Sequence, residues 1–311
     1  MVVDARTWGV IKPGLLTTAE GTQSGAFGPS DWGLVLAVSV IWGGSFFFIA
    51  NGLESFPPPV ISLIRLSLGF LALSSIRSAR DSTFDRHELQ RAALLGLTWL
   101  AGPFLLFPIA EQWISSAVAG MLNGSIPVVA AIISSVMLHR SPGRRSIIGI
   151  AIGFVGIVLI SLPSLSGSSR TALGVGLVLL AVLGYGVSTN LSVPLIQKHG
   201  SLAVQWRVQG FAVLWSLPFG LFKVGDVHDV TFKSAASVTV LGLFGTGIAL
   251  VLAGRLFGRV GATRGTIFNY LVPVVAIILG VAFRDDIFEW LHGVGIALVL
   301  VGAFTLSRAK G

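Results

Sequence analysis

The feature that most constrains this chain is a series of apolar blocks, each about 20 residues long. A helix of about 20 residues crosses the ~30 Å hydrocarbon core of a bilayer. The sequence therefore predicts an all-α integral membrane protein with ten transmembrane helices. The blocks cover residues 32–50, 59–76, 92–110, 114–138, 146–163, 172–192, 203–222, 234–254, 263–283 and 290–307.

Composition agrees with lipid as the surrounding solvent. Of the 311 residues, 53% are hydrophobic and only 11% are charged, whereas soluble domains are near a quarter charged. The chain has no cysteine, which excludes disulfides and thiolate metal sites. Its net charge of +8 comes from basic residues scattered between apolar blocks, so it indicates membrane topology and not a nucleic-acid partner.

Lys and Arg fall mainly on one side of the membrane if the spans alternate in direction. Thirteen share the side of both termini, and four lie on the other side. Because positive charge is retained on the cytoplasmic side of short loops, residues 1–31 and 308–311 are predicted to be cytoplasmic. The Gly/Ser/Thr-rich leader, residues 1–31, is also expected to be disordered. The thirteen are Arg77, Arg80, Arg86, Arg91, Arg140, Arg144, Arg145, Lys198, Arg255, Arg259, Arg264, Arg308 and Lys310.

An internal repeat accompanies the ten blocks. Residues 123–130 (NGSIPVVA) match residues 269–276 (NYLVPVVA) at an offset of 146, and residues 42–45 (WGGS) match residues 185–188 (YGVS) at 143. The sequence predicts two related five-helix repeats, residues 32–163 and 172–307. Because five is odd, the second repeat enters the membrane from the opposite side. Such inverted repeats place a substrate site near the bilayer midplane, between the halves.

These ordered motifs resemble the drug/metabolite transporter superfamily, EamA type. The resemblance rests on residues 41–45, Arg65, residues 261–263, the two Pro-containing spans and the pairs Gly149/Gly156 and Gly295/Gly302. It implies a ten-helix secondary carrier that moves amino acids, related amphipathic metabolites or drugs by alternating access, usually as export. Such proteins usually carry an acidic residue after each Pro-containing span. Asp286 stands there in the second half, but Arg140 stands there in the first.

The leading site candidates are two amides, Asn123 and Asn269, each four residues before a proline. An amide in hydrocarbon is costly unless its polar atoms are paired, so both are expected to face a cavity or the bundle interior. They contact substrate, or they form a structural interhelical hydrogen bond worth about 0.6 kcal/mol. Polar and aromatic residues near the same level are further cavity candidates: Trp42, Ser45, Trp99, Tyr185, Ser188, Phe244 and Tyr270.

Among the charged residues in or beside the apolar blocks, Glu111 and Arg65 are candidates for function. Glu111 is the leading candidate for proton coupling, but its position at the outer end of the third block favours a solvated interface residue. Arg65 either attracts an anionic group or extends its guanidinium to the headgroups. Pro127 and Pro273 remove helix donors, so they are candidate breaks for gating, with ordinary packing as the alternative. Glycines 149, 153, 156, 295 and 302 favour close packing of the fifth and tenth blocks, against each other or against a neighbouring helix.

Other function classes fit less well. An intramembrane enzyme would need His or paired carboxylates within the spans, but all five His lie in or beside connections, so no catalytic residue, metal or cofactor is expected. A channel-like facilitator stays open as an alternative. The expected partners are a small-molecule substrate, membrane lipid and a proton or exchange solute, in the inner (cytoplasmic) membrane, with a homodimer left open.

Overall fold

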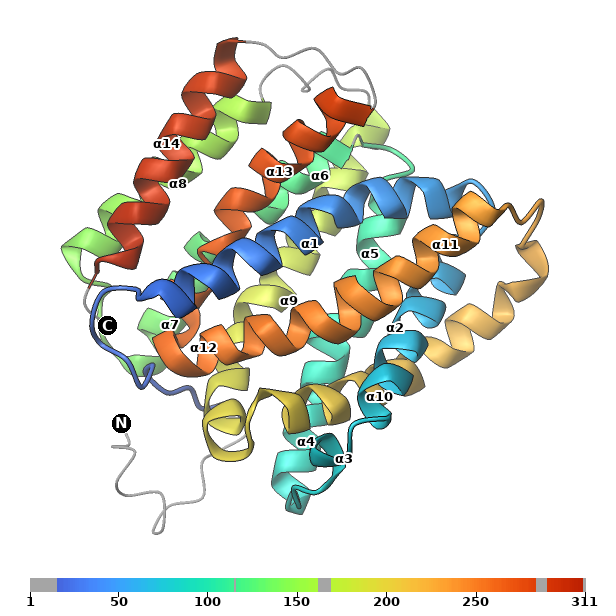
Figure 1. Ribbon diagram of the computed structural model, residues 1–311, viewed down its shortest axis with the longest axis horizontal. Coiled ribbons are helices and arrows are strands. Elements are labelled where there is room, and N and C mark those ends of the chain that lie inside the picture. Colours follow the sequence, from blue (N-terminus) through green and yellow to red (C-terminus); the bar gives the residue numbers. More distant parts are fainter. Residues whose placement is uncertain (1–15, 115, 162–168, 284–289, 310–311) are drawn as a thin grey trace.

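The computed structural model describes residues 16–114, 116–161, 169–283 and 290–309, and every regular element in these ranges is a helix (Figure 1). Several of the elements are continuous with the next, so α4, η2 and α5 form one long helix and α11, η5 and α12 form another. The elements of the first half are α1 (Pro29–Leu53), α2 (Pro58–Ser74), α3 (Arg77–Arg80), α4 (Arg86–Leu95), η2 (Gly96–Ala101), α5 (Gly102–Ala110), α6 (Ser116–Asn123), α7 (Ile126–Leu138) and α8 (Arg144–Ser161). Those of the second half are α9 (Ser169–His199), α10 (Ser201–Phe222), η4 (Val224–Asp226), α11 (Phe232–Val240), η5 (Leu241–Ile248), α12 (Ala249–Gly265), α13 (Phe268–Phe283) and α14 (Trp290–Ser307).

The helices have the length and surface of membrane spans. Within the described residues, five are long and apolar enough to cross a bilayer, and shorter apolar helices cover Pro58–Ser74, Ile126–Leu138 and Phe268–Leu279. Large apolar side chains also cover the outside, as with Leu71, 61% exposed, and Val136, 67% exposed. An outer surface of this kind is stable in lipid and would aggregate in water. The chain is an all-helical membrane protein.

Helix ends follow the local sequence. Pro58 and Pro59 occupy the first turn of α2, where the missing N–H groups are not needed. Asp85 and Glu88 form a capping box at the start of α4, with 2.9 Å bonds in both directions. His139 ends α7 in the left-handed conformation, with φ at 51°.

Several boundaries differ from those predicted, and two of the differences lie beside the predicted amides. The fourth block, residues 114–138, is divided, because α6 ends at Asn123 and α7 begins at Ile126. The eighth block was expected to end at 254, but α12 continues to Gly265 and is separated from α13 by only residues 266–267. The backbone reverses direction partly through Gly261, whose φ of 80° is accessible to glycine at little cost.

Packing between the two halves is reciprocal. The first helix, α1, packs on α13, α11 and α12, and the first helix of the other half, α9, packs on α6, α7 and α5. In the same way α2 contacts η5, while α10 contacts η2. The pairs α2–α10 and α8–α14 each join equivalent helices, and α8 and α14 lie side by side in Figure 1. Each kind of contact thus recurs with the halves exchanged.

The pair α8–α14 is held together by its glycines. A Cβ on Gly149 would lie 3.0 Å from Gly302 O, and a Cβ on Gly156 would lie 2.7 Å from Gly295 O. Backbones can approach this closely only where side chains are absent. The prediction that the fifth and tenth blocks pack together through these residues is confirmed.

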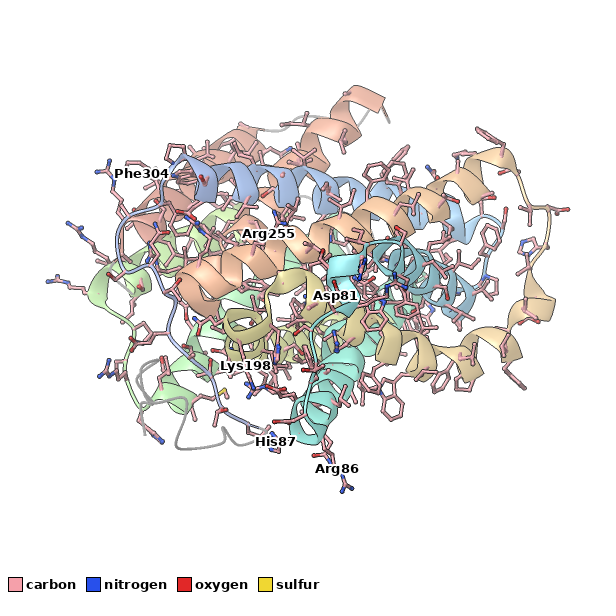
Figure 2. The ribbon with its side chains drawn as sticks, turned by 60° about the horizontal axis from the view of Figure 1, so that its bottom comes forward. Asp81, Arg86, His87, Lys198, Arg255 and Phe304 are labelled. Carbon is pink, nitrogen blue, oxygen red and sulfur yellow. The ribbon has the colours of Figure 1, made fainter. Side chains whose placement is uncertain are left out.

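One end of the bundle collects the basic residues that were predicted to share a side. Arg140 pairs with Glu20 at 2.8 Å, and Lys198 pairs with Glu88 at 2.6 Å. Figure 2 shows this region, with Arg86 and His87 at the start of α4 and Lys198 at the end of α9. At the opposite end Lys233 pairs with Glu54 at 2.7 Å. The connections therefore segregate into two groups, as alternating spans require.

Residues 16–28 differ from the expected disordered leader. They lie against the basic end, where Thr18 Oγ1 donates to Asn190 O at 2.9 Å and Gln23 N donates to Arg259 O at 2.8 Å. Helix α1 also begins at Pro29, three residues before the predicted block. Composition alone did not reveal these partners, because most are backbone carbonyls and arginines that lie far away in the sequence.

Candidate functional site: a cavity between the two halves

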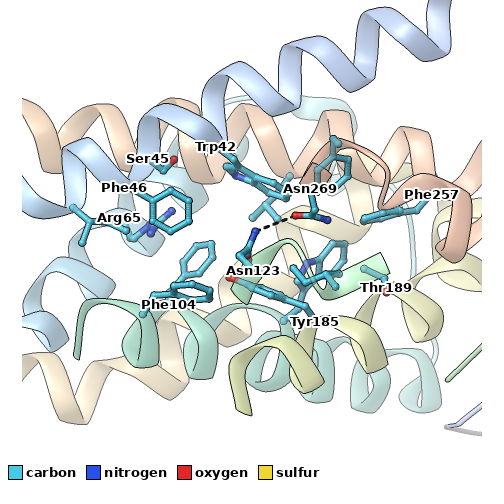
Figure 3. Close-up of a pocket in the computed structure, with 16 residues that line it drawn as sticks. Trp42, Ser45, Phe46, Arg65, Phe104, Asn123, Tyr185, Thr189, Phe257 and Asn269 are labelled. Carbon is cyan, nitrogen blue, oxygen red and sulfur yellow. Dashed lines mark hydrogen bonds between the residues drawn. The ribbon is translucent and has the colours of Figure 1, made fainter. Parts of the chain in front are cut away.

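A cavity opens at the centre of the bundle, where the two halves meet (Figure 3). Half of its lining residues are aromatic, and its polar groups include two amides, three hydroxyls and one guanidinium. Pockets of this composition, apolar with a few placed polar groups, are typical of small-molecule sites. The lining residues are Trp42, Ser45, Phe46, Ile49, Arg65, Trp99, Phe104, Phe107, Asn123, Ile126, Tyr185, Thr189, Leu250, Phe257, Phe268 and Asn269.

The two predicted amides meet in this cavity. Asn123 Nδ2 donates to Asn269 Oδ1 at 3.2 Å, the bond drawn in Figure 3. Asn269 Nδ2 in turn donates to Thr266 O at 3.0 Å. The bond joins the end of α6 to the start of α13, so it links the two segments that match in sequence at an offset of 146.

The two prolines lie next to these amides. Pro127 is in the first turn of α7, directly after the break at residues 124–125, and Pro273 lies inside α13. Each proline stands four residues after an Asn, so it removes the N–H that a regular helix would direct to that Asn carbonyl. The helix ladder is therefore interrupted beside both amides.

Trp42 connects the wall to an irregular helix of the other half. Its indole Nε1 donates to Gly245 O at 2.8 Å, and its ring meets Phe268 edge to face at 5.0 Å. Gly245 belongs to η5, a stretch of π-helix whose wider turn frees carbonyls for such bonds. The first half has the corresponding irregularity, η2, in its third helix, and Trp99 of η2 also lines the cavity.

Aromatic rings form two continuous walls. On one side Phe107 lies 6.0 Å from Phe46 and 6.1 Å from Tyr185, measured between ring centroids. On the other side Phe257 lies 5.9 Å from Trp99 and 5.8 Å from Phe268. Such rings supply a rigid apolar surface that fits the body of an amphipathic solute.

Arg65 is the charged group of the cavity. Its side chain comes from α2 and is only 4% exposed, and its Nε donates to Thr246 Oγ1 at 3.2 Å. The guanidinium carbon lies 3.8 Å from the centroid of the Phe104 ring, a cation–π contact. The alternative in which Arg65 extends to the headgroups is therefore wrong, since the side chain points into the bundle.

The other predicted residues divide into two groups. Trp42, Ser45, Trp99 and Tyr185 line the cavity together with the two amides. Three do not line it, and each is accounted for by the helix face on which it lies. Ser188 faces Thr98, at 2.7 Å between the hydroxyls, and Phe244 is 48% exposed on the outer surface. Tyr270 is fully buried but points away from the cavity toward α8, where its hydroxyl donates to Ile150 O at 3.1 Å.

Glu111 is the C-cap residue of α5 and does not line the cavity, although it interacts electrostatically with Arg65. Arg140, which stands where an acidic residue was expected, forms an ion pair with Glu20 of the leader. Asp286, its counterpart in the second half, lies outside the described residues. The exchange of an acidic for a basic residue after the first Pro-containing span is therefore matched by a carboxylate from another part of the chain.

Several lining residues were not among the sequence candidates. Thr189 lines the cavity in place of its neighbour Ser188, and Phe257 and Phe268 complete a wall. The polar residues 188–190 indicate that this part of α9 lies near a polar site. Hydropathy does not show which of the three side chains faces the cavity, because that depends on the rotation of the helix about its axis. Nothing in the sequence marks Thr246 as the partner of Arg65.

Comparison with known proteins agrees with this architecture. The EamA-like transporter family matches residues 32–162 and 172–308, which are the two halves described above. The chain belongs to the EamA-like transporter family. It is a membrane transporter.

Among curated relatives, a protein of Streptantibioticus cattleyicolor named "Probable terminal-alkyne amino-acid exporter" is 26% identical over 278 residues, covering 89% of this chain and 93% of that protein. The Escherichia coli K12 protein named "Uncharacterized inner membrane transporter YedA" is 26% identical over 287 residues, with 89% and 91% covered. A solved crystal structure superposes with a TM-score of 0.70 at 15% identity, covering 89% of this chain and 96% of that one. This last likeness shows a shared fold.

Proposed function

We propose that this transporter is a secondary carrier of small amphipathic metabolites, with amino acids and related compounds as the first candidates. Its ten transmembrane helices form two inverted five-helix repeats, residues 32–163 and 172–307, and the central cavity is the substrate site. The cavity alternates in access between the two sides of the membrane. The observation that carries the proposal is the Asn123–Asn269 bond, which joins equivalent positions of the two halves inside an aromatic cavity.

Reciprocal packing supports the inverted repeat. Contacts α1–α13 and α9–α7, or α2–η5 and α10–η2, are the same contact with the halves exchanged. Two halves related in this way can rock against one another around a fixed site, the common basis of alternating access. The breaks beside Pro127 and Pro273 give α7 and α13 a place to bend during that motion.

The orientation of the protein in the membrane is inferred from its charge distribution, and its location and direction of transport from the names of its relatives. The basic end, which holds Arg140, Lys198 and Arg259, is the cytoplasmic end by the positive-inside rule, so both termini are cytoplasmic. An inner-membrane location agrees with the name of the Escherichia coli relative, and export agrees with that of the Streptantibioticus relative. Gradients of the solute, of protons or of an exchanged solute supply the driving force.

The test is a solute panel in reconstituted vesicles, with and without a pH gradient. Wild type is compared with Asn123→Ala, Asn269→Ala and Glu111→Gln. We expect saturable flux in wild type and a raised KM in both Asn variants, because these amides line the cavity. Normal transport by both Asn variants would contradict the central site, and flux that does not saturate would favour a channel-like facilitator.

A further inference from the structure

Arg65 combines deep burial with the lack of a carboxylate in direct contact among the described residues. It is 4% exposed, and the only hydrogen bond that it makes with the described residues runs from Nε to Thr246 Oγ1. No described Asp or Glu lies within ion-pair distance of its guanidinium. The terminal nitrogens Nη1 and Nη2 thus have no bonded partner among the described residues, although a guanidinium carries five N–H donors.

Such a charge is costly in the interior of a membrane protein. Moving a cation away from water is unfavourable unless an anion and hydrogen bonds replace the hydration. The two groups nearest to Arg65, the hydroxyl of Thr246 and the ring of Phe104, are neutral. Glu111 is a described carboxylate that acts on Arg65 electrostatically, but it does not reach ion-pair distance. Arg65 is therefore a fixed positive charge that no described carboxylate contacts.

The surroundings hold this charge in place and leave space beside it. Thr246 is fully buried and donates its own hydroxyl to Leu241 O at 3.0 Å, so its oxygen is oriented for Arg65. A Cβ on Gly245 would lie 3.6 Å from Arg65 Nη2 and 3.2 Å from Ser45 Oγ. Glycine at this position therefore preserves room around the terminal nitrogens, next to the cavity wall at Ser45 (Figure 3).

We propose that Arg65 binds the carboxylate of the transported solute, so that the cavity selects carboxylates with an apolar body over organic cations. This inference rests on the proposed function and names its substrate class. A planar guanidinium with free terminal nitrogens matches a carboxylate through two parallel hydrogen bonds. Aromatic walls alone would favour a cation, but Arg65 already covers the Phe104 face and repels a second positive charge.

The test uses three solutes that share one phenyl body: 3-phenylpropanoate, 3-phenylpropanamide and 3-phenylpropylammonium. Thermal stabilisation of the purified protein reports binding, and competition in vesicles reports transport. We expect the carboxylate to bind wild type at least tenfold more tightly than the amide or the ammonium. Arg65→Lys should keep a weakened preference because the charge stays, and Arg65→Gln should lose the preference because the charge is removed.

Arg207→Gln is the matched control. Arg207 is a half-buried arginine of α10. It is bonded to the carbonyls of Ala79, Ala203 and Ser82 and does not line the cavity. Its variant should retain the carboxylate preference. A wild type without that preference, or an Arg65→Gln variant that elutes as a folded monodisperse species and keeps it, overturns the proposal. Preferred binding of the carboxylate without saturable flux would instead refute the carrier and leave Arg65 as the anion site.

A second inference comes from an independent feature, the strap formed by residues 16–28. It crosses the basic end and bonds to helices of both halves. Arg91 of the first half donates to Thr17 O, and Thr18 Oγ1 donates to Asn190 O of the second half at 2.9 Å. Farther along, Arg264 Nη1 donates to Gln23 O at 3.1 Å, and Phe27 N donates to Ser307 O at 3.2 Å.

The strap is also tightly seated. Gly21 lies so close to the backbone of Val260 and Gly261 that a side chain at this position would clash with main-chain atoms. Glu20 binds α9 through its carbonyl, which accepts from Gln197 Nε2 at 2.7 Å, and binds the end of α7 through its ion pair with Arg140. A separation of the halves at this end must break several of these contacts together.

We infer that the strap is a latch that closes the basic end of the cavity and must release before that end opens. The chain has no cysteine, so paired thiols can be introduced without background. The test joins Glu20→Cys of the strap to Gln197→Cys of α9, a helix of the second half whose Gln197 bonds to Glu20 O, with a reducible bifunctional thiol reagent. We expect the link to reduce flux at least tenfold and reductant to restore it, because alternating access requires this end to open.

The control is Arg77→Cys with Asp81→Cys, an ion-paired couple four residues apart in one connection. Linking these two thiols should leave flux unchanged, since the link spans no moving interface. Full flux in a completely linked Glu20/Gln197 variant overturns the latch. Because the unlinked variant is measured in the same vesicles, inhibition by the link is separable from a failure of transport itself.

Discussion

The Asn123–Asn269 bond permits a quantitative prediction by a double-mutant cycle. Within membrane proteins such bonds average about 0.6 kcal/mol and reach about 1.7 kcal/mol. The Nδ2–Oδ1 separation of 3.2 Å is longer than the usual 2.9–3.0 Å, so we expect a coupling near the average. Asn123→Ala, Asn269→Ala and the double variant should therefore deviate from additivity by about 0.6 kcal/mol.

The two single variants should lose different amounts of free energy of unfolding. Asn269 also donates to Thr266 O at 3.0 Å, so Asn269→Ala loses a second bond, which contributes about 0.5–1.5 kcal/mol. Unfolding in mixed micelles, followed by the fluorescence of the eight tryptophans, measures each free energy. Asn269→Ala should be the more destabilised variant.

A control cycle combines Asn123→Ala with Asn190→Ala. Asn190 is a fully buried amide that donates to Ala130 O and Gly186 O and has no bond to Asn123. Its effect should add to that of Asn123→Ala within about 0.3–0.5 kcal/mol. An Asn123/Asn269 coupling no larger than in this control would refute the bond between the halves.

Three further predictions follow from the packing. Gly302→Ala should lower the unfolding temperature, because its Cβ would lie 2.5 Å from Gly153 N, whereas Gly33→Ala, which meets nothing within 4 Å, should be neutral or stabilising. Trp42→Phe should raise KM with only a small change in unfolding temperature, since it keeps an aromatic ring but loses the bond to Gly245 O. A loss of transport that is fully explained by a lower unfolding temperature would contradict this. Glu88→Gln should destabilise the basic end, seen as faster proteolysis there, because Lys198 and His199 both bond to that carboxylate.

The sequence predicts the framework of this fold well, because its signals are local and repeated. The length of the apolar blocks identifies the membrane helices. The glycine pairs of α8 and α14 predict the contact between these helices, since close approach of two backbones explains glycine at matched spacings. The equivalent amides are found from the repeat, and symmetric halves place equivalent residues near a common axis. These inferences need no side-chain orientation.

Which other side chains line the cavity depends on how each helix is rotated about its axis, and hydropathy does not give this rotation. Phe244 and Ser188 were selected by their level in the membrane, but a rotation of about 100° per residue decides which side chain faces the cavity. The π-helical turns η2 and η5 shift that phase further. The partners of the strap and of Arg65 are long-range contacts between unlike residues, so no periodic pattern marks them.

Counterflow tests the central claim most directly. Vesicles preloaded with an unlabelled apolar amino acid such as L-leucine are diluted into the labelled compound, without any ion gradient. A carrier with one cavity that alternates between two sides should show saturable uptake that the internal solute accelerates several-fold, and Asn123→Ala should weaken that acceleration. Uptake that rises linearly with concentration and ignores the internal solute would contradict alternating access.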